Sequence, residues 1–288
     1  MLKYRCLLPL VLALCSMSNA RGADSFFDSN GVKIRYATAG AGEPVVLIHG
    51  WMGDSTMWGA KLSAPEGFQL IAFDCRGHGK SDKPHDPDKY GVEMSEDVVR
   101  LLDHLKIKKA HLIGYSMGAF IVGKVAATHS DRVLSVTYGG QAPIIAGPKS
   151  PGSNEVEVFA KAVDEGKGLG PYLMSVWPAD RPKLTLDQAN ALCKLMYGEK
   201  DVKAYAVSGL SLPKLEVTAE DLRKCKAPTL FIYGGNESRY VKDRIAEARQ
   251  VLPSSQVKVV EGSDHVSTPA KPEFGQTILA FLNSVRTK

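Results

Sequence analysis

The five residues Gly114-Tyr115-Ser116-Met117-Gly118 place a single serine between two glycines, and this spacing suits nucleophilic catalysis. The apolar run 110–113 before them predicts a short buried strand, and the apolar segment 119–127 after them predicts a packed helix. A strand that turns so sharply into a helix strains the serine backbone, so the residues two positions away must be small. Such a turn exposes the Ser116 hydroxyl and sets the N–H of Met117 at a helix N-terminus, where it can stabilise an oxyanion.

This serine needs partners, because a hydroxyl is a weak nucleophile at neutral pH. An imidazole must accept its proton, and a carboxylate must orient the imidazole. Of the seven histidines, only His265 follows a late buried strand within a loop. Glu237 ends the preceding predicted strand, whereas no acidic residue follows the strand predicted at 133–138. Glu237 is therefore the favoured acid, with Asp243 as the alternative, and the chain order is Ser116, Glu237, His265.

Alternating strands and helices must position these residues. Continuous apolar runs predict buried strands at 44–48, 70–73, 110–113, 133–138, 228–233 and 257–260, and alternating polarity predicts a half-exposed strand at 31–38. Apolar residues at helical spacing predict helices at 95–105, 119–127, 241–252 and 278–285. This alternation predicts an α/β fold with a mostly parallel central sheet flanked by helices on both faces.

The pattern changes between residues 141 and 226, where no buried strand is predicted and helical signals accumulate. Thr185 to Gln188 has capping-box spacing before an apolar helical face, and Thr218 to Asp221 repeats it. We therefore expect a helical cap at 141–226, inserted between two parts of the α/β core at 21–140 and 227–288.

The first 20 residues differ from the rest of the chain. Lys3 and Arg5 precede the apolar run 7–14, and small residues at 18–20 match a signal-peptidase site. This pattern predicts a signal peptide over residues 1–20 and a mature chain that begins near Arg21, in a secreted or periplasmic protein. A buried N-terminal helix is the structural alternative. Lipid attachment at Cys15 is less favoured, because the large side chain just before it fits a lipoprotein cleavage box poorly.

The composition is that of an ordinary globular protein, with 288 residues, 44% hydrophobic and 23% charged. Loss of Lys3 and Arg5 lowers the formal charge from +5 to +3, and no basic cluster remains, so nucleic acid is not an expected partner. No stretch after the leader is long enough to predict a membrane span. Three cysteines remain after the leader, namely Cys75, Cys193 and Cys225. Either all three are free thiols, or Cys193 and Cys225 form a disulfide. None has metal-ligand spacing, and we expect neither metal nor cofactor.

Five stretches together resemble the α/β-hydrolase family, in its capped single-domain form. They are His49-Gly50-Trp51, Asp74-Cys75-Arg76-Gly77-His78-Gly79-Lys80-Ser81, Gly114 to Gly118, Gly234-Gly235-Asn236-Glu237, and His265 followed by Pro272 and Phe274. The resemblance implies Ser116 as nucleophile, His265 as base, and an oxyanion hole from the N–H groups of Trp51 and Met117. Glu237 departs from the aspartate that most of the family uses, but glutamate serves in some branches.

The nucleophile decides the chemistry that the resemblance implies. Haloalkane dehalogenases and epoxide hydrolases of this fold carry aspartate at the position of Ser116, so neither activity is expected. Acyl transfer to water remains, and we expect a serine hydrolase that cleaves small to medium carboxylic esters or lactones through an acyl-enzyme. The alternatives are a carbon–carbon bond hydrolase, a perhydrolase, or a non-catalytic ligand-binding homologue. A peptidase is less favoured, because no acidic cluster in the cap is evident for holding a substrate amine.

Some residues near these motifs have structural interpretations. Trp58, Tyr115, Trp177 and Tyr197 are candidates to line an acyl pocket beneath the cap, with core packing as the alternative. Arg76 is expected to tie loops together rather than bind substrate. Asp264 lies beside His265 in the sequence, but neighbouring side chains in a loop usually point apart.

Overall fold

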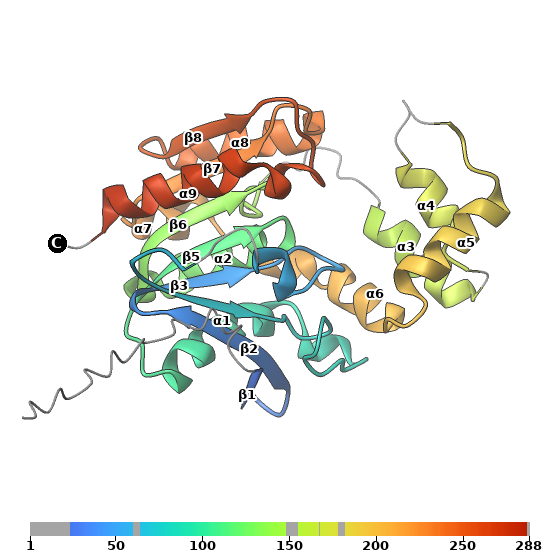
Figure 1. Cartoon of the computed structure of the whole chain (residues 1–288), viewed down its shortest axis with the longest axis horizontal. Coiled ribbons are helices and arrows are strands. Elements are labelled where there is room, and N and C mark those ends of the chain that lie inside the picture. The colour runs from blue at the N-terminus through green and yellow to red at the C-terminus, as the bar shows by residue number, and fades with distance from the viewer. Residues whose placement is uncertain (1–23, 60–63, 148–154, 167, 178–181, 287–288) are drawn as a thin grey trace, which may run out of the picture.

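One eight-stranded sheet forms the core of the computed structural model (Figure 1), which describes residues 24–59, 64–147, 155–166, 168–177 and 182–286. The strand order is β1-β2-β4-β3-β5-β6-β7-β8. The strands are β1 (Ser25–Asp28), β2 (Lys33–Gly40), β3 (Gly42–Ile48), β4 (Gly67–Phe73), β5 (Ala110–Tyr115), β6 (Val133–Gly139), β7 (Thr229–Gly234) and β8 (Gln256–Val260). The pairs β1–β2 and β2–β4 are antiparallel and the other neighbours are parallel, which confirms the predicted α/β fold.

Helices cover both faces of the sheet because the central strands are apolar on both faces. Along β3, Val46 and Ile48 join the core under α1 (Val92–His104), α2 (Met117–Thr128) and α8 (Arg239–Val251). Val45 and Leu47 point the other way and pack in the core with α9 (Pro272–Val285). Successive side chains of a strand alternate between faces, so each continuous apolar run serves two cores.

Between β6 and β7 the chain is helical. It forms α3 (Glu155–Glu165), α4 (Gly170–Val176), α5 (Leu186–Tyr197), α6 (Val202–Leu210) and α7 (Ala219–Lys224). Helices α3, α4 and α5 stand beyond the edge of the sheet, and α6 runs back toward the core (Figure 1). We call α3 to α6 the cap helices.

Side-chain caps start two of these helices where the sequence places them. Thr185 and Gln188 exchange hydrogen bonds with each other's backbone at the start of α5, in a complete capping box. The Thr218 hydroxyl accepts a hydrogen bond from the N–H of Asp221 at the start of α7. Both predicted helix starts are therefore confirmed.

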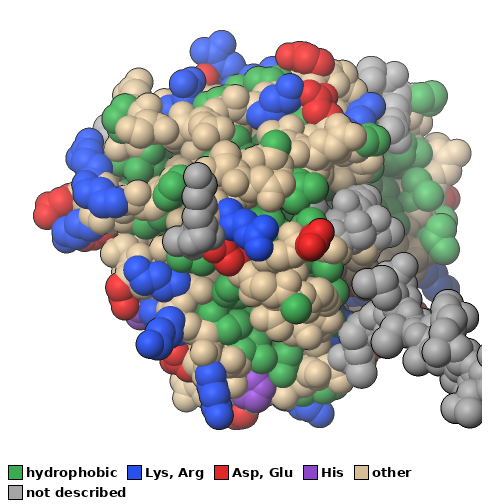
Figure 2. All heavy atoms as spheres, turned by 60° about the vertical axis from the view of Figure 1, so that its left-hand side comes forward, with side chains coloured by type: hydrophobic (Ala, Val, Ile, Leu, Met, Phe, Trp, Pro, Cys, Tyr) green, Lys and Arg blue, Asp and Glu red, His purple; other side chains and the backbone are tan. Residues whose placement is uncertain are grey.

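The predicted signal peptide over residues 1–20 lies outside the described residues. Cys75, Cys193 and Cys225 are free thiols, so the alternative Cys193–Cys225 bond is not formed. In the described ranges, no helix combines the length and the apolar character needed to cross a bilayer. Figure 2 shows basic and acidic side chains interspersed over the face of the molecule that it presents.

Candidate active site

Ser116 lies on the turn between β5 and α2, with a left-handed backbone φ of 54°. In this conformation the backbone at Gly114 and Gly118 packs closely against neighbouring backbone atoms. A Cβ at Gly114 would lie 2.1 Å from the carbonyl oxygen of Gly118, and a Cβ at Gly118 would lie 2.3 Å from the carbonyl oxygen of Ile48. Both distances are far below van der Waals contact, so the two glycines are needed for the turn, as the sequence predicts.

Three parallel strands deliver the three polar side chains to one edge of the sheet. Ser116 follows β5, Glu237 follows β7, and His265 lies in the loop after β8. His265 Nε2 lies 3.0 Å from Ser116 Oγ, and His265 Nδ1 lies 2.8 Å from Glu237 Oε1. An ionised carboxylate only accepts hydrogen bonds, so Nδ1–H donates to Glu237 and Nε2 accepts the serine proton. The arrangement can activate the hydroxyl for attack.

The carboxylate that contacts His265 is that of Glu237 and not that of Asp243. Glu237 has only 2% of its side chain exposed. The N–H of its neighbour Asn236 donates to the carbonyl of Ser263 at 2.8 Å, which joins the Glu237 turn to the His265 loop. Asp243 pairs with Arg239 on an exposed side of α8, at 2.7 Å.

The pKa of His265 reflects opposing influences. Burial of the imidazole lowers the pKa, but the hydrogen bond to Glu237 and the charge of Glu237 raise it, and the net pKa lies above the ordinary value of 6.5. The charges of Glu155 and Asp264 also raise it. The carboxylate of Asp264 accepts hydrogen bonds from the N–H groups of Val266 and Ser267, so it stabilises the turn in which it lies.

Tyr115 holds the His265 loop, a role that the sequence analysis missed. Its hydroxyl donates to the main-chain carbonyl of His265 at 2.6 Å, and the two rings lie 5.4 Å apart. The other aromatic candidates have structural contacts as well. Trp58 is buried against Phe274, Trp177 donates to the carbonyl of Pro182, and Tyr197 lies 6.5 Å from Phe159 between ring centres.

The segment from His49 to Trp51 packs beside Ser116. A Cβ at Gly50 would lie 3.3 Å from the Cβ of Ser116, so this backbone runs close over the serine. The buried His49 ring holds the segment in place, since Nδ1–H donates to the carbonyl of Gly50 at 2.7 Å and Nε2 accepts from the N–H of Cys75 at 3.0 Å. The backbone before Trp51 therefore lies next to Ser116, and Met117 follows Ser116 as the first residue of α2.

The indole of Trp51 also joins this loop to the cap helices. Its Nε1–H donates to the carbonyl of Tyr205 in α6 at 2.9 Å. Its ring lies 5.1 Å from that of Phe159 in α3, edge to face. The loop beside Ser116 and the helices α3 and α6 are thus packed as one unit.

Arg76 is structural, as expected. Its guanidinium is fully buried and donates to both carboxylate oxygens of Asp97, at 2.7 and 2.6 Å. It also donates to the carbonyl groups of Lys89 and Ser29. These bonds tie the turn after β4 to α1 and to the segment after β1.

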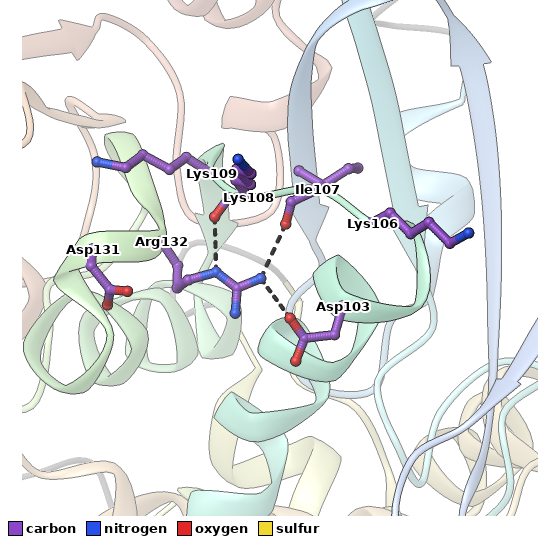
Figure 3. A pocket seen from close by; sticks show the side chains of 7 residues that line it. All are labelled: Asp103, Lys106, Ile107, Lys108, Lys109, Asp131 and Arg132. Atoms are coloured by element: carbon purple, nitrogen blue, oxygen red, sulfur yellow. Dashed lines mark hydrogen bonds and ion pairs between the residues drawn. The ribbon is translucent and has the colours of Figure 1, made fainter.

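A separate surface hollow of ≈ 470 Å³ lies at the opposite edge of the sheet, where β5 begins (Figure 3). Arg132 crosses it and donates to the carbonyls of Lys108 and Ile107 and to Asp103. Arg132 therefore joins the start of β6 to the segment between α1 and β5. Within the described ranges, no group of three His, Cys, Asp or Glu side chains is placed to hold a metal ion.

The sheet order, the serine turn and the neighbouring histidine and carboxylate define a hydrolase of the α/β type. A family model described as the alpha/beta hydrolase fold matches residues 43–271, and the chain belongs to this family. The chain is 28% identical to a non-heme chloroperoxidase from Kitasatospora aureofaciens over 276 residues, which cover 88% of this chain and 97% of that protein.

Solved structures share the fold over nearly the whole chain. An enol-lactonase from Burkholderia xenovorans has a TM-score of 0.71 and 25% identity, and the match covers 90% of this chain and 100% of that one. A structure from work on carboxylesterases of Nitrososphaera gargenis has a TM-score of 0.75 and 24% identity, with 91% and 98% covered.

Proposed function

We propose that the protein is a serine hydrolase that cleaves carboxylic esters, including lactones, through an acyl-enzyme on Ser116. The observation that carries the proposal is the continuous pair of hydrogen bonds from Ser116 Oγ to His265 Nε2, at 3.0 Å, and from His265 Nδ1 to Glu237 Oε1, at 2.8 Å. The similarity to the enol-lactonase, at 25% identity, supports an ester or lactone as the bond that is cleaved.

The geometry suits a two-step acyl transfer. Ser116 Oγ attacks the ester carbonyl while its proton moves to His265 Nε2, and the N–H groups of Trp51 and Met117 stabilise the oxyanion. The imidazolium then protonates the leaving alcohol as the carbon–oxygen bond breaks. Water attacks the acyl-enzyme with His265 again as base, which releases the acid and restores the serine. Glu237 stays ionised and stabilises the imidazolium in both steps.

The test combines covalent labelling with turnover. Purified protein is treated with a fluorophosphonate probe and with p-nitrophenyl esters of rising chain length, beside Ser116→Ala and Glu237→Gln. We expect labelling and turnover to disappear in Ser116→Ala and turnover to fall by roughly 10²-fold or more in Glu237→Gln. Asp243→Asn is the matched acid control and should keep full activity. A wild-type protein that neither labels nor hydrolyses any ester would refute the proposal in favour of a ligand-binding role.

A second candidate activity uses the same acyl-enzyme. The 28% identical relative is named a non-heme chloroperoxidase, which favours a test with hydrogen peroxide. Peroxide in place of water would attack the acyl-enzyme, form a peracid and release Ser116. Peracid formation from a short ester and hydrogen peroxide, lost in Ser116→Ala, would establish this activity, and its absence would restrict the enzyme to hydrolysis.

The cellular location is a further part of the proposal. The leader at residues 1–20 supports export and cleavage near Arg21. Mass analysis of the N-terminus of the protein recovered from its native cells tests this. Retention of the full leader in the mature protein would overturn it.

A further inference from the structure

The first turn of α3 lies against the loop that flanks the nucleophile. If Gly209 of α6 carried a Cβ, that atom would lie 2.8 Å from Val156 Cγ1 and 2.9 Å from Trp51 Cζ2. The side chains of Val156 and Trp51 therefore meet over the same glycine. One turn further along α3, the ring of Phe159 packs against that of Trp51. The start of α3 is thus held beside Trp51, at the end of the segment that runs over Ser116.

Glu155 is the first residue of α3 and lies four residues before Phe159, on the same side of the helix. The hydroxyl of Tyr172 in α4 donates to Glu155 Oε1 at 2.9 Å. Tyr172 is almost fully buried, and its ring packs 4.9 Å from Phe159. Glu155 itself is half-buried, so its carboxylate is held by a fixed partner at the rim of the packed rings.

The negative charge of Glu155 reaches the active site. It contributes to the raised pKa of His265, and its influence exceeds that of Asp264, the direct chain neighbour of the histidine. The packing of Val156 and Phe159 against Trp51 places the first turn of α3 beside the loop that runs over Ser116, and the effect on His265 agrees with that position. The catalytic steps proposed above leave Glu155 without a role, because Glu237 alone orients His265.

We propose that Glu155 binds a positively charged group of the substrate, so that the enzyme favours cationic esters, such as quaternary ammonium or protonated amine esters, over neutral esters of the same shape. This inference rests on the proposed ester hydrolysis at Ser116. A single fixed carboxylate beside an aromatic ring suits an ammonium group, which gains both Coulomb attraction and contact with the ring of Trp51. The sequence showed no acidic cluster in the cap, and one carboxylate brought in by folding is sufficient for one cation.

The test uses ester pairs that differ only in charge. On the acyl side, p-nitrophenyl 4-(trimethylammonio)butyrate is compared with p-nitrophenyl 5,5-dimethylhexanoate, and on the alcohol side acetylcholine is compared with 3,3-dimethylbutyl acetate. We expect wild type to prefer the cationic ester in at least one pair by about tenfold in kcat/KM, beyond any difference in their spontaneous hydrolysis. Glu155→Gln should remove this preference, so that kcat/KM falls about tenfold more for the cationic ester than for the neutral ester of the same pair.

Two further variants separate charge from structure. Glu157→Gln removes the same charge from an exposed position on the same helix and should keep the preference. Tyr172→Phe keeps the charge but frees the carboxylate from its fixed position, and should reduce the preference in part. Equal loss of kcat/KM for charged and neutral esters in Glu155→Gln would overturn the proposal, because the glutamate would then act on His265. No charge preference in either pair would also overturn it.

Binding of choline to Ser116→Ala, measured by calorimetry, separates the two proposals, because it needs no turnover. Wild type that hydrolyses no ester, while choline binds Ser116→Ala more tightly than Ser116→Ala/Glu155→Gln, would refute ester hydrolysis and retain the cation site. Ester turnover with equal choline binding in the two variants would do the reverse.

Discussion

The hydroxyl of Tyr115 donates a 2.6 Å hydrogen bond to the main-chain carbonyl of His265, although the two residues are far apart in the chain. Tyr115 is the residue directly before Ser116, so the end of β5 carries Ser116 and also secures the loop of His265. Tyr115→Phe removes this bond, together with the interaction of the hydroxyl with Thr268 in the same loop, and we expect a lower kcat by about three- to tenfold with little change in KM. Steady-state kinetics with a p-nitrophenyl ester measure this.

Tyr36→Phe is the matched control for this prediction. The Tyr36 hydroxyl lies 3.1 Å from His104 Nε2 in a part-buried contact outside the Ser116–Glu237–His265 group. Both variants should lose about 1 kcal/mol of stability, and only Tyr115→Phe should lose kcat. Equal kcat in the two variants would show that the bond to His265 has no part in positioning the base.

The activity should fall at acidic pH because His265 must be neutral to accept the serine proton. Its pKa is raised above 6.5, mainly by Glu237 and further by Glu155 and Asp264, against the lowering effect of burial. The kcat/KM profile should therefore lose activity as the pH falls through an apparent pKa above 6.5. Glu237→Gln should shift the acidic side of the kcat/KM profile to lower pH and should also lower the maximal kcat/KM. An acidic side that does not shift in this variant would contradict the assigned pair.

The serine turn should tolerate no side chain at Gly118. An added Cβ would lie 2.3 Å from the backbone oxygen of Ile48, which cannot move without disturbing β3. We expect Gly118→Ala to lower the free energy of unfolding by about 3 kcal/mol or to prevent folding. Gly59→Ala, where the added Cβ would lie 3.3 Å from the carbonyl oxygen of Thr56 on an exposed turn, should cost far less. Urea unfolding midpoints compare the two variants, and equal midpoints would contradict the close packing.

The buried ion pair of Arg76 and Asp97 should matter far more for stability than an exposed one. Asp97→Asn removes the buried carboxylate that pairs with the fully buried guanidinium of Arg76 and leaves only the more distant Glu93, at 3.7 Å, so we expect a loss of about 3 kcal/mol. Asp243→Asn breaks the pair with Arg239, whose side chains are 87% and 44% exposed, and should cost less than about 1 kcal/mol. Calorimetric or urea unfolding tests this, and a similar loss in both would refute the structural role of Arg76.

The sequence is informative wherever local pattern and position decide the structure. Two-sided apolar runs locate the buried strands, and the small residues around Ser116 locate the turn, because each depends on neighbours a few positions away. The short strand β1 was not predicted, since its four residues, Ser25 to Asp28, make too brief a pattern. Helix α1 begins at Val92, before the predicted residue 95, because Gly91 with a φ of 69° ends the preceding turn there.

Roles that depend on contacts between distant segments were not predictable. Tyr115 was considered for a pocket, yet its hydroxyl meets a loop from the far end of the chain. Glu155 gave no signal at all, because its position depends on Tyr172 and on the packing of α3 against Trp51. Local sequence patterns reveal neither contact, because each one joins two elements that are separate in the chain.

The cap helices interrupt the sheet in the order of synthesis, since β6 ends at Gly139 and its parallel partner β7 begins at Thr229. A chain that emerges from the ribosome up to the end of α6 holds Ser116 but lacks both Glu237 and His265. Contacts between β6 and β7 close a long loop and form slowly. Under the proposed function, hydrolytic activity has to appear last, after the C-terminal strands have docked, so that the unfinished chain carries a serine that is not yet activated.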